Sequence, residues 1–153
     1  MKYTNTKRIK EQVVIINQAY VEKLFNDCNL LYFENKLTPI PINIINSVEV
    51  NGDFTFNIDF DKKVIDSMVI QINQLRPRTQ DQLISTMVHE MIHYVVTSQF
   101  KPELIDEAIW YYKNNNREKF DQLLLVGKYA HSGKWAEVAK SLVDKYNLKI
   151  NKA

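Results

Sequence analysis

TQDQLISTMVHEMIHYVVT, residues 79–97, is the stretch of sequence that decides the fold. Thr79 and Gln82, three residues apart, fit a capping box, which predicts a helix from about Gln80 to Thr97. Apolar side chains surround most of the helical wheel of this segment. The polar residues that share the remaining arc are Thr86, His89, Glu90 and His93. We therefore expect a helix that is buried except where these polar side chains face a cavity.

A second amphipathic helix is predicted upstream, from about Glu11 to Phe33. Apolar residues recur there at spacings of three and four, as one face of a helix requires. They are Val13, Ile16, Tyr20, Val21, Leu24, Cys28 and Leu31. Because Cys28 lies on this stripe, we interpret it as a core residue with an unreactive thiol. It is the only cysteine of the chain, which excludes an intrachain disulfide and a cysteine-rich zinc ribbon.

Between these two helices the pattern changes to an alternating one. Thr38-Pro39-Ile40-Pro41 cannot continue a helix, and eight apolar residues from Ile42 to Phe60 fall on even positions, which predicts two strands. A strict two-residue turn at Asn51-Gly52 would put the two apolar rows on opposite faces, so we expect an odd-length loop or a bulge there. Residues 68–72 predict a third strand, and with it a small, mostly antiparallel three-stranded sheet.

Further helical segments are predicted after residue 100. Pro102 suits the first turn of a helix to Tyr112, Gly127 can cap a helix that contains Phe120 and Leu124, and residues 132–146 form the last one. The expected class is α+β, with the sheet packed against the N-terminal helix and helix 80–97, and additional C-terminal helices. Since the 153 residues contain no repeat or linker, we expect a single domain over 1–153 with a core at about 11–146.

The overall composition argues against several kinds of partner. Twenty Lys and Arg against eighteen Asp and Glu give a formal net charge of +2, too balanced to attract a nucleic acid or an acidic membrane at long range. No apolar run is long enough for a signal-peptide core or a membrane span. We therefore expect a cytoplasmic (intracellular) protein without membrane association, monomeric by default.

The segment His89-Glu90-Met91-Ile92-His93 carries the chemistry. Histidines four residues apart project from one face of a helix, so both imidazoles can reach one tetrahedral metal ion, and the glutamate between them can act on a water at that ion. The alternative is that both histidines are structural. Burying both imidazoles and a carboxylate on an apolar helix would cost roughly several kcal/mol of desolvation free energy, which a bound cation offsets. The sequence therefore predicts a metal site.

A zinc ion that keeps one position open for water or substrate needs a third protein ligand. His131, the only other histidine, precedes the last helix, where a short loop could present it to the cavity. Asp106 and Glu107 are its rivals, because a helix-borne glutamate completes the zinc site in the gluzincins, another large group of HExxH enzymes. We favour His131 and keep a gluzincin-type site with Glu107 as the alternative.

The chain resembles the SprT-like (Spartan-type) zinc metallopeptidase domain over about residues 20–146. The resemblance rests on residues 24–39, which include Tyr32, Phe33 and Leu37, on the HExxH segment after three strands, and on His131 with Trp135 four residues later. It implies a zincin-like fold, a zinc-dependent metalloendopeptidase acting on protein substrates, and Glu90 as the catalytic base. The Zn²⁺ ligands that it implies are His89, His93 and His131. Because the resemblance extends to Spartan, which cleaves protein crosslinked to DNA, DNA-associated substrates are a further expectation.

Some questions stay open at the level of sequence. The stretch between His93 and His131 is longer than in the family, which predicts a helical insertion at about 102–126 beside or over the cleft. Tyrosines that could assist the oxyanion are Tyr94, Tyr111, Tyr112 and Tyr129. The competing hypothesis is a catalytically silent, zinc-stabilised module for protein or nucleic-acid interaction.

Overall fold

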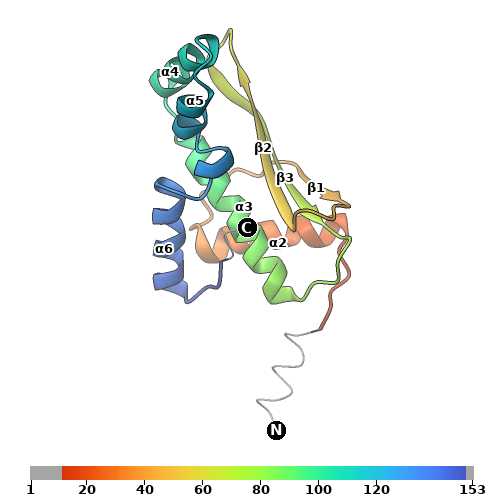
Figure 1. Cartoon of the computed structure of the whole chain (residues 1–153). Helices are drawn as coiled ribbons and strands as arrows, with labels where there is room; N and C mark the ends of the chain where they lie inside the picture. The colour runs from red at the N-terminus through yellow and green to blue at the C-terminus, as the bar shows by residue number, and fades with distance from the viewer. Residues whose placement is uncertain (1–11, 151–153) are drawn as a thin grey trace.

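The computed structural model describes residues 12–150 as an α+β fold in which helices flank a small three-stranded sheet (Figure 1). The elements in chain order are α2 (Gln18–Tyr32), β1 (Ile42–Ile45), β2 (Gly52–Asp59), β3 (Val64–Asn73), α3 (Gln80–Ser98), α4 (Pro102–Lys113), α5 (Arg117–Leu124), the 3-10 turn η1 (Gly127–Tyr129) and α6 (Lys134–Tyr146). The predicted α+β class and the three strands are confirmed.

Helix α2 is shorter at its start than the sequence pattern predicts. Glu11, the expected first residue, lies outside the described residues, and residues 12–17 are not helical. Val13 forms an isolated antiparallel bridge with Thr79, and the side chain of Asn17 caps the first turn of α2. Residues 13–16 are four consecutive β-branched side chains, which favour an extended backbone. The predicted start was wrong for this reason.

The sheet is mixed, with the strand order β1-β3-β2: its longer pairing is antiparallel, as predicted, but its shorter pairing is parallel. β3 is antiparallel to β2 and parallel to β1, and Ile70 of β3 is opposite Phe54 on one side and Ile42 on the other. β1 and β2 therefore do not pair, and Asn51-Gly52 is not the turn of a hairpin. A register shift does occur in β2, between Thr55 and Asn57.

Burial explains why β3 takes the central position. Its residues Ile70 and Ile72 have no exposed surface, as expected for a strand that is paired on both edges and covered by helices. β2 alternates instead, with Asp53, Thr55 and Asn57 exposed, which suits an outer strand. The order of strands thus follows from which strand has the most apolar surface to bury.

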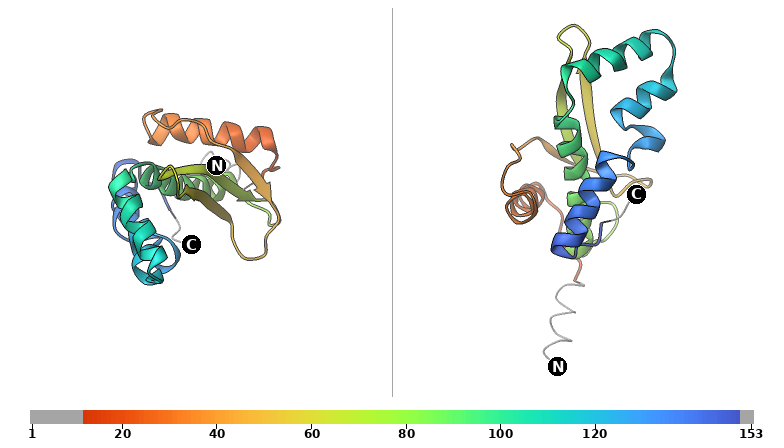
Figure 2. Two further views of the ribbon diagram at one scale, coloured as in Figure 1. Left: turned by 90° about the horizontal axis from the view of Figure 1, so that it is seen from above. Right: turned by 90° about the vertical axis from the view of Figure 1, so that its left-hand side faces the viewer.

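Helix α3 is the central element of the fold and contacts α2, α6, β2 and β3 (Figures 1 and 2). The predicted capping box is present, since Thr79 Oγ1 accepts from the Gln82 backbone and the Gln82 side chain accepts from the Thr79 backbone. The fully buried apolar residues of α3 are Leu83, Met87, Val88, Met91 and Ile92. They confirm that apolar contacts surround most of this helix.

The predicted helical segment at 102–126 forms helices α4 and α5. This pair lies beside the turn that joins β2 and β3 (Figure 1), where Lys63 Nζ is 2.7 Å from Asp106 Oδ1 and the Phe60 and Tyr112 rings are 5.4 Å apart. From there the chain returns through η1 to α6, which packs against α3 (Figure 2). The pair therefore stands beside the outer edge of the sheet.

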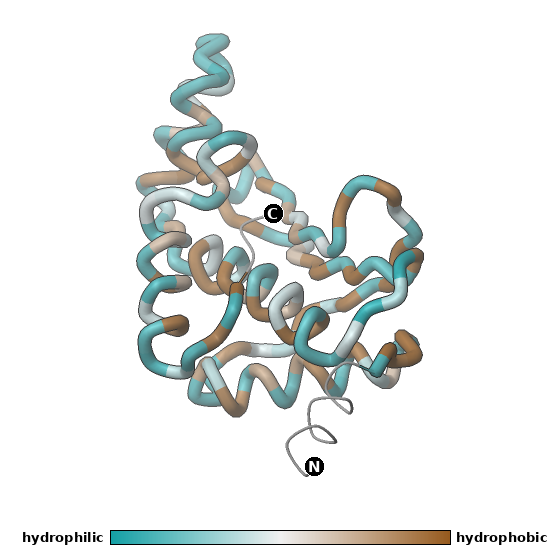
Figure 3. Tube along the Cα trace, turned by 60° about the horizontal axis from the view of Figure 1, so that its bottom comes forward, coloured by the Kyte–Doolittle hydropathy of each residue, from teal (hydrophilic) through white to brown (hydrophobic). Residues whose placement is uncertain are grey.

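The C-terminal cap of α5 differs from the prediction. Leu125, with φ 52°, adopts the left-handed cap conformation, and its backbone N–H donates to Asp121 O. Gly127 lies two residues further on, in η1. Hydrophilic and hydrophobic residues are interspersed along the coloured part of the trace (Figure 3). Within residues 12–150 no helix has both the length and the apolar character to cross a membrane.

Candidate metal centre

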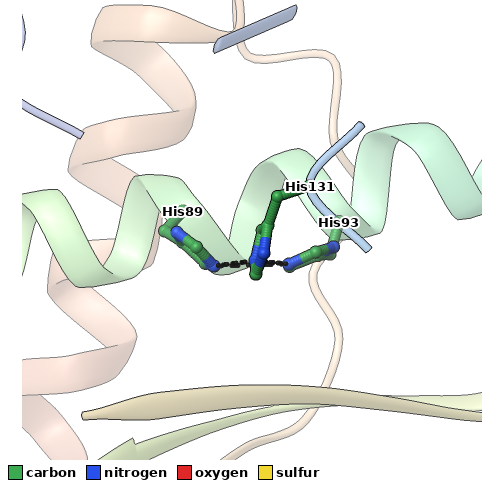
Figure 4. A group of neighbouring side chains, drawn as sticks. All are labelled: His89, His93 and His131. Atoms are coloured by element: carbon green, nitrogen blue, oxygen red, sulfur yellow. Dashed lines mark hydrogen bonds between the residues drawn. The ribbon is translucent and has the colours of Figure 1, made fainter. Parts of the chain in front are cut away.

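The three histidines of the chain meet at one point (Figure 4). His89 and His93 lie one turn apart on α3, and His131 reaches them from the loop that precedes α6. The Nε2–Nε2 distances are 3.3 Å for His89 and His93, 3.3 Å for His93 and His131, and 2.9 Å for His89 and His131. The structure thus brings together the three histidines that the sequence analysis singled out.

The spacing of these nitrogens fits one shared metal ion. Four tetrahedral ligands at about 2.0–2.1 Å from an ion have nitrogens about 3.3–3.4 Å apart, which two of the three distances match. Burial lowers the pKa of His93 to about 3, and the neighbouring His89 and His131 add to this effect. The His93 ring is therefore neutral at physiological pH, which is the state in which an imidazole nitrogen binds a metal.

Aromatic side chains fix the orientation of the imidazoles. The Trp135 ring, only 1% exposed, has its centroid 4.9 Å from that of His89, 4.8 Å from that of His131 and 5.6 Å from that of His93. The Phe54 ring of β2 also stacks with the His93 ring, with 6.3 Å between the two ring centroids. These ring contacts restrict the orientations that the three imidazoles can adopt, which favours the convergence of their donor nitrogens.

Two glycines set the path of the loop that carries His131. Gly127 has φ 59°, and Gly133 has φ 54° with ψ −124°, a conformation that residues with a Cβ rarely adopt. Between them, Ser132 Oγ donates to Tyr129 O at 2.8 Å. His131 lies before the last helix, as predicted, and these local turns direct its ring back toward α3.

Glu90 lines the same pocket as the three histidines, a cavity of about 500 Å³. The residue is 5% exposed, and burial raises its carboxyl pKa to about 8, with the charge of Asp53 adding to the effect. A carboxyl with this pKa can take up and release a proton near neutral pH, as a general acid or base must.

The start of β2 lies against Glu90, and only glycine permits this approach. A Cβ at Gly52 would lie 2.7 Å from Thr86 Cγ2 and 3.1 Å from Glu90 Oε2. From the sequence pattern alone, Asn51-Gly52 is interpreted only as a connection between strands. A glycine at the edge of a strand pattern is also a signal of close backbone approach, and here that reading is the correct one.

The remaining surface of the pocket is largely apolar. It comes from β2, from the end of α3, from the segment after α5 and from α6. The lining residues other than the histidines and Glu90 are Glu49, Val50, Asn51, Gly52, Asp53, Phe54, Phe56, Val96, Thr97, Leu124, Leu125, Val126, Gly127, Ala130 and Trp135. Sequence reasoning missed Phe54 as part of the site, because it was interpreted only as one of the alternating apolar residues of its strand. Trp135 was named as the aromatic residue four positions after His131, but its ring contacts with His89 and His131 were not predicted.

The rival ligands and the four tyrosines lie elsewhere. Asp106 pairs with Lys63, and Glu107 lines a separate pocket between α4, α5 and α6. The hydroxyl of Tyr94 donates to Thr38 O at 2.7 Å, and that of Tyr129 donates to Glu118 Oε1 at 3.0 Å. Neither these two tyrosines nor Tyr111 and Tyr112 line the histidine pocket.

The raised pKa of Glu90 predicts how the metal-free chain responds to pH. Its carboxyl titrates at about 8 in the folded chain and near 4.5 when unfolded, so its contribution to stability is complete below about pH 4.5 and is lost as the pH rises through about 8. Metal-free Glu90→Gln, which cannot ionise, should therefore exceed the parent in free energy of unfolding by about 2–4 kcal/mol at pH 8 and by much less at pH 4.5.

Urea unfolding in the presence of a chelator at pH 4.5, 6 and 8 measures this difference. Glu137→Gln is the matched control, because Glu137 is exposed on α6 and outside the pocket. A parent-to-variant difference for Glu90→Gln that does not grow with pH would show that the carboxyl is not buried in the way described.

Comparison of the chain with models of known protein families and with curated proteins finds no match. The residues of the site are therefore the basis on which a function can be inferred.

Proposed function

We propose that the chain is a zinc-dependent metalloendopeptidase that hydrolyses peptide bonds of protein substrates. The observation that carries this proposal is the convergence of three histidine Nε2 atoms in one pocket with the buried carboxyl of Glu90. A metal kept for structure alone needs ligands but no adjacent acid or base, so the position of Glu90 favours catalysis over a silent module.

Zinc is the ion that the donor set favours. Three imidazole nitrogens leave one tetrahedral position for water or substrate, as in catalytic zinc sites. The residues that would bind it are His89, His93 and His131. When bound, zinc supplies a Lewis acid that polarises the scissile carbonyl and makes a water molecule more acidic.

Glu90 supplies the proton transfers. Its carboxylate accepts a proton from the attacking water and then donates that proton to the nitrogen of the leaving amine. Its burial keeps bulk water away, and its contact with Gly52 limits the positions that the carboxylate can occupy. Trp135 and Phe54 keep the imidazoles in place during these steps.

The sheet edge beside the pocket offers a place for an extended substrate. β2 pairs only with β3 among the described strands, so its other edge is open next to the histidines. A peptide that adds to this edge is bound through its backbone, which gives affinity with little dependence on sequence. The resemblance to SprT-like domains adds to the proposal, and it alone supports DNA-associated proteins as the substrates in an intracellular setting.

The direct test is metal content together with proteolysis. The purified chain is expected to contain about one zinc ion by elemental analysis and to cleave casein. Treatment with 1,10-phenanthroline should stop cleavage, and added zinc should restore it. A folded chain that binds no zinc, or a zinc-loaded chain that cleaves neither casein nor itself, would refute the proposal.

A further inference from the structure

We propose that the groove between the outer edge of β2 and helix α5 is a substrate subsite that selects a bulky apolar side chain some residues away from the scissile bond. This inference rests on the proposed peptidase function and adds a substrate class to it. The groove has a volume of about 400 Å³ and is separate from the metal pocket, although the two share part of their lining.

One side of the groove is the edge of a strand. It is formed by the consecutive residues 54–58 of β2 and by Phe60. Alternate residues of a strand would form one face, whereas consecutive residues present its backbone edge. Because β2 is the outer strand of the sheet, this edge can take an additional extended chain.

The other side is an apolar stripe of α5. Phe120 and Leu124, four residues apart on this helix, line the groove together with Val126. Phe120 is only partly buried, and it contacts Tyr112 at 5.4 Å between ring centroids. α5 therefore turns apolar side chains toward an open strand edge, with a space for further apolar side chains between them.

Charge favours an apolar occupant over an acidic or basic one. Arg117 is the single charged residue in the lining of this groove. Its Nε lies 2.9 Å from Asp121 Oδ1, so its charge is already paired. A substrate carboxylate or ammonium would lose hydration here without gaining a free counter-charge, whereas an apolar side chain gains from leaving water.

Continuity with the metal pocket identifies the occupant as the substrate chain. Phe54, Phe56, Leu124 and Val126 line both cavities, and Phe54 also stacks with His93. A peptide that reaches the metal pocket along β2 therefore passes through the groove. No second molecule needs to be invoked to fill it.

The geometry of the strand gives the distance of the subsite from the scissile bond. An extended peptide advances by about 3.3 Å per residue, so the four steps from Phe54 to Ile58 correspond to about 13 Å. The selected side chain should therefore lie about two to five residues from the bond that is cut. Whether the selected side chain lies N-terminal or C-terminal to the scissile bond depends on whether the substrate pairs with β2 in a parallel or an antiparallel direction.

A set of matched fluorogenic peptides tests the subsite. The peptides share a polar sequence and differ at one position, which lies two to five residues to either side of the scissile bond and carries Ala, Glu or Phe. At one of these positions Phe should raise kcat/KM over Ala by about 10-fold or more. Phe120→Ala should bring this ratio close to one. Leu123→Ala is the matched control, because Leu123 lies on the same helix but lines another pocket, and it should retain the ratio.

Ile58→Thr provides a second variant, on the opposite side of the groove, in case Phe120→Ala disturbs the packing of α4 on α5. Ile58→Thr should also reduce the preference for Phe. Folding of each variant is checked by circular dichroism and zinc content. Cleavage of the peptides with no preference at any position, or a preference that survives in both variants, would overturn the subsite while leaving the peptidase function intact.

Peptide binding separates failure of the subsite from failure of the catalytic proposal. Fluorescence anisotropy with the Glu90→Gln variant measures the affinity for the same labelled peptides without turnover. Tighter binding of the Phe peptide that is lost on adding Phe120→Ala supports the groove even if the parent cleaves nothing. Equal affinities for the Ala and Phe peptides, or no binding up to about 1 mM, would overturn it.

Discussion

Replacing Glu90 with glutamine is expected to lower kcat/KM for peptide hydrolysis by about 100- to 10,000-fold while the zinc content stays the same. Glutamine has nearly the same shape as the buried glutamate but cannot accept the proton of the attacking water. Because Glu90 is not one of the three clustered nitrogen donors, its replacement removes proton transfer and not the metal site. Initial rates on one peptide, with elemental analysis of the same samples, measure both quantities.

Glu137→Gln again serves as the control, since it removes a glutamate of α6 outside the pocket. Equal cleavage by the parent and by Glu90→Gln would show that another group performs the proton transfer. If neither protein cleaves any substrate but both bind zinc, the silent interaction module becomes the better account.

Replacing His131 with alanine is expected to weaken zinc binding by about 100-fold or more, whereas Glu107→Ala should leave the affinity unchanged. Removing a residue that only orients a metal ligand already lowers metal affinity by about 10- to 100-fold. His131 itself contributes one of the three clustered donor atoms. Glu107 is exposed and lines a different pocket. Competition with a chromophoric chelator at a fixed pH gives the two dissociation constants.

The opposite pattern, with Glu107→Ala weakening zinc binding and His131→Ala without effect, would place the third ligand on α4 and indicate a gluzincin-type site. Circular dichroism of both variants with and without zinc excludes unfolding as the cause. The comparison is informative because the two residues were the competing candidates from sequence alone.

The features that sequence could predict are local ones. Helix α3 was predicted because its apolar spacing, its capping box at Thr79 and its four polar residues on one arc all depend on neighbours within a few positions. The three-histidine cluster could be predicted because His89 and His93 fix the site and the chain has one further histidine. These inferences need no knowledge of the sheet.

The errors concern contacts between distant residues. Alternation of apolar and polar residues indicates a strand but not the strand with which it pairs. The pattern at 42–60 therefore could not predict that β3 lies between β1 and β2. At the start of α2 the β-branched residues 13–16 favour an extended backbone, and the bridge between Val13 and Thr79 adds a long-range contact that the helical spacing did not indicate. The position of Trp135 against the imidazoles likewise depends on how α6 packs on α3.

The placement of His131 on a different element from His93 has a consequence for folding. An ion bound by both would act as a cross-link and close a loop of 38 residues, which contains α4 and α5. If the loop-entropy model for disulfides applies, restricting the unfolded chain in this way contributes up to about 4 kcal/mol. Chelation would then lower the thermal midpoint of unfolding, because it frees the unfolded chain from this restriction.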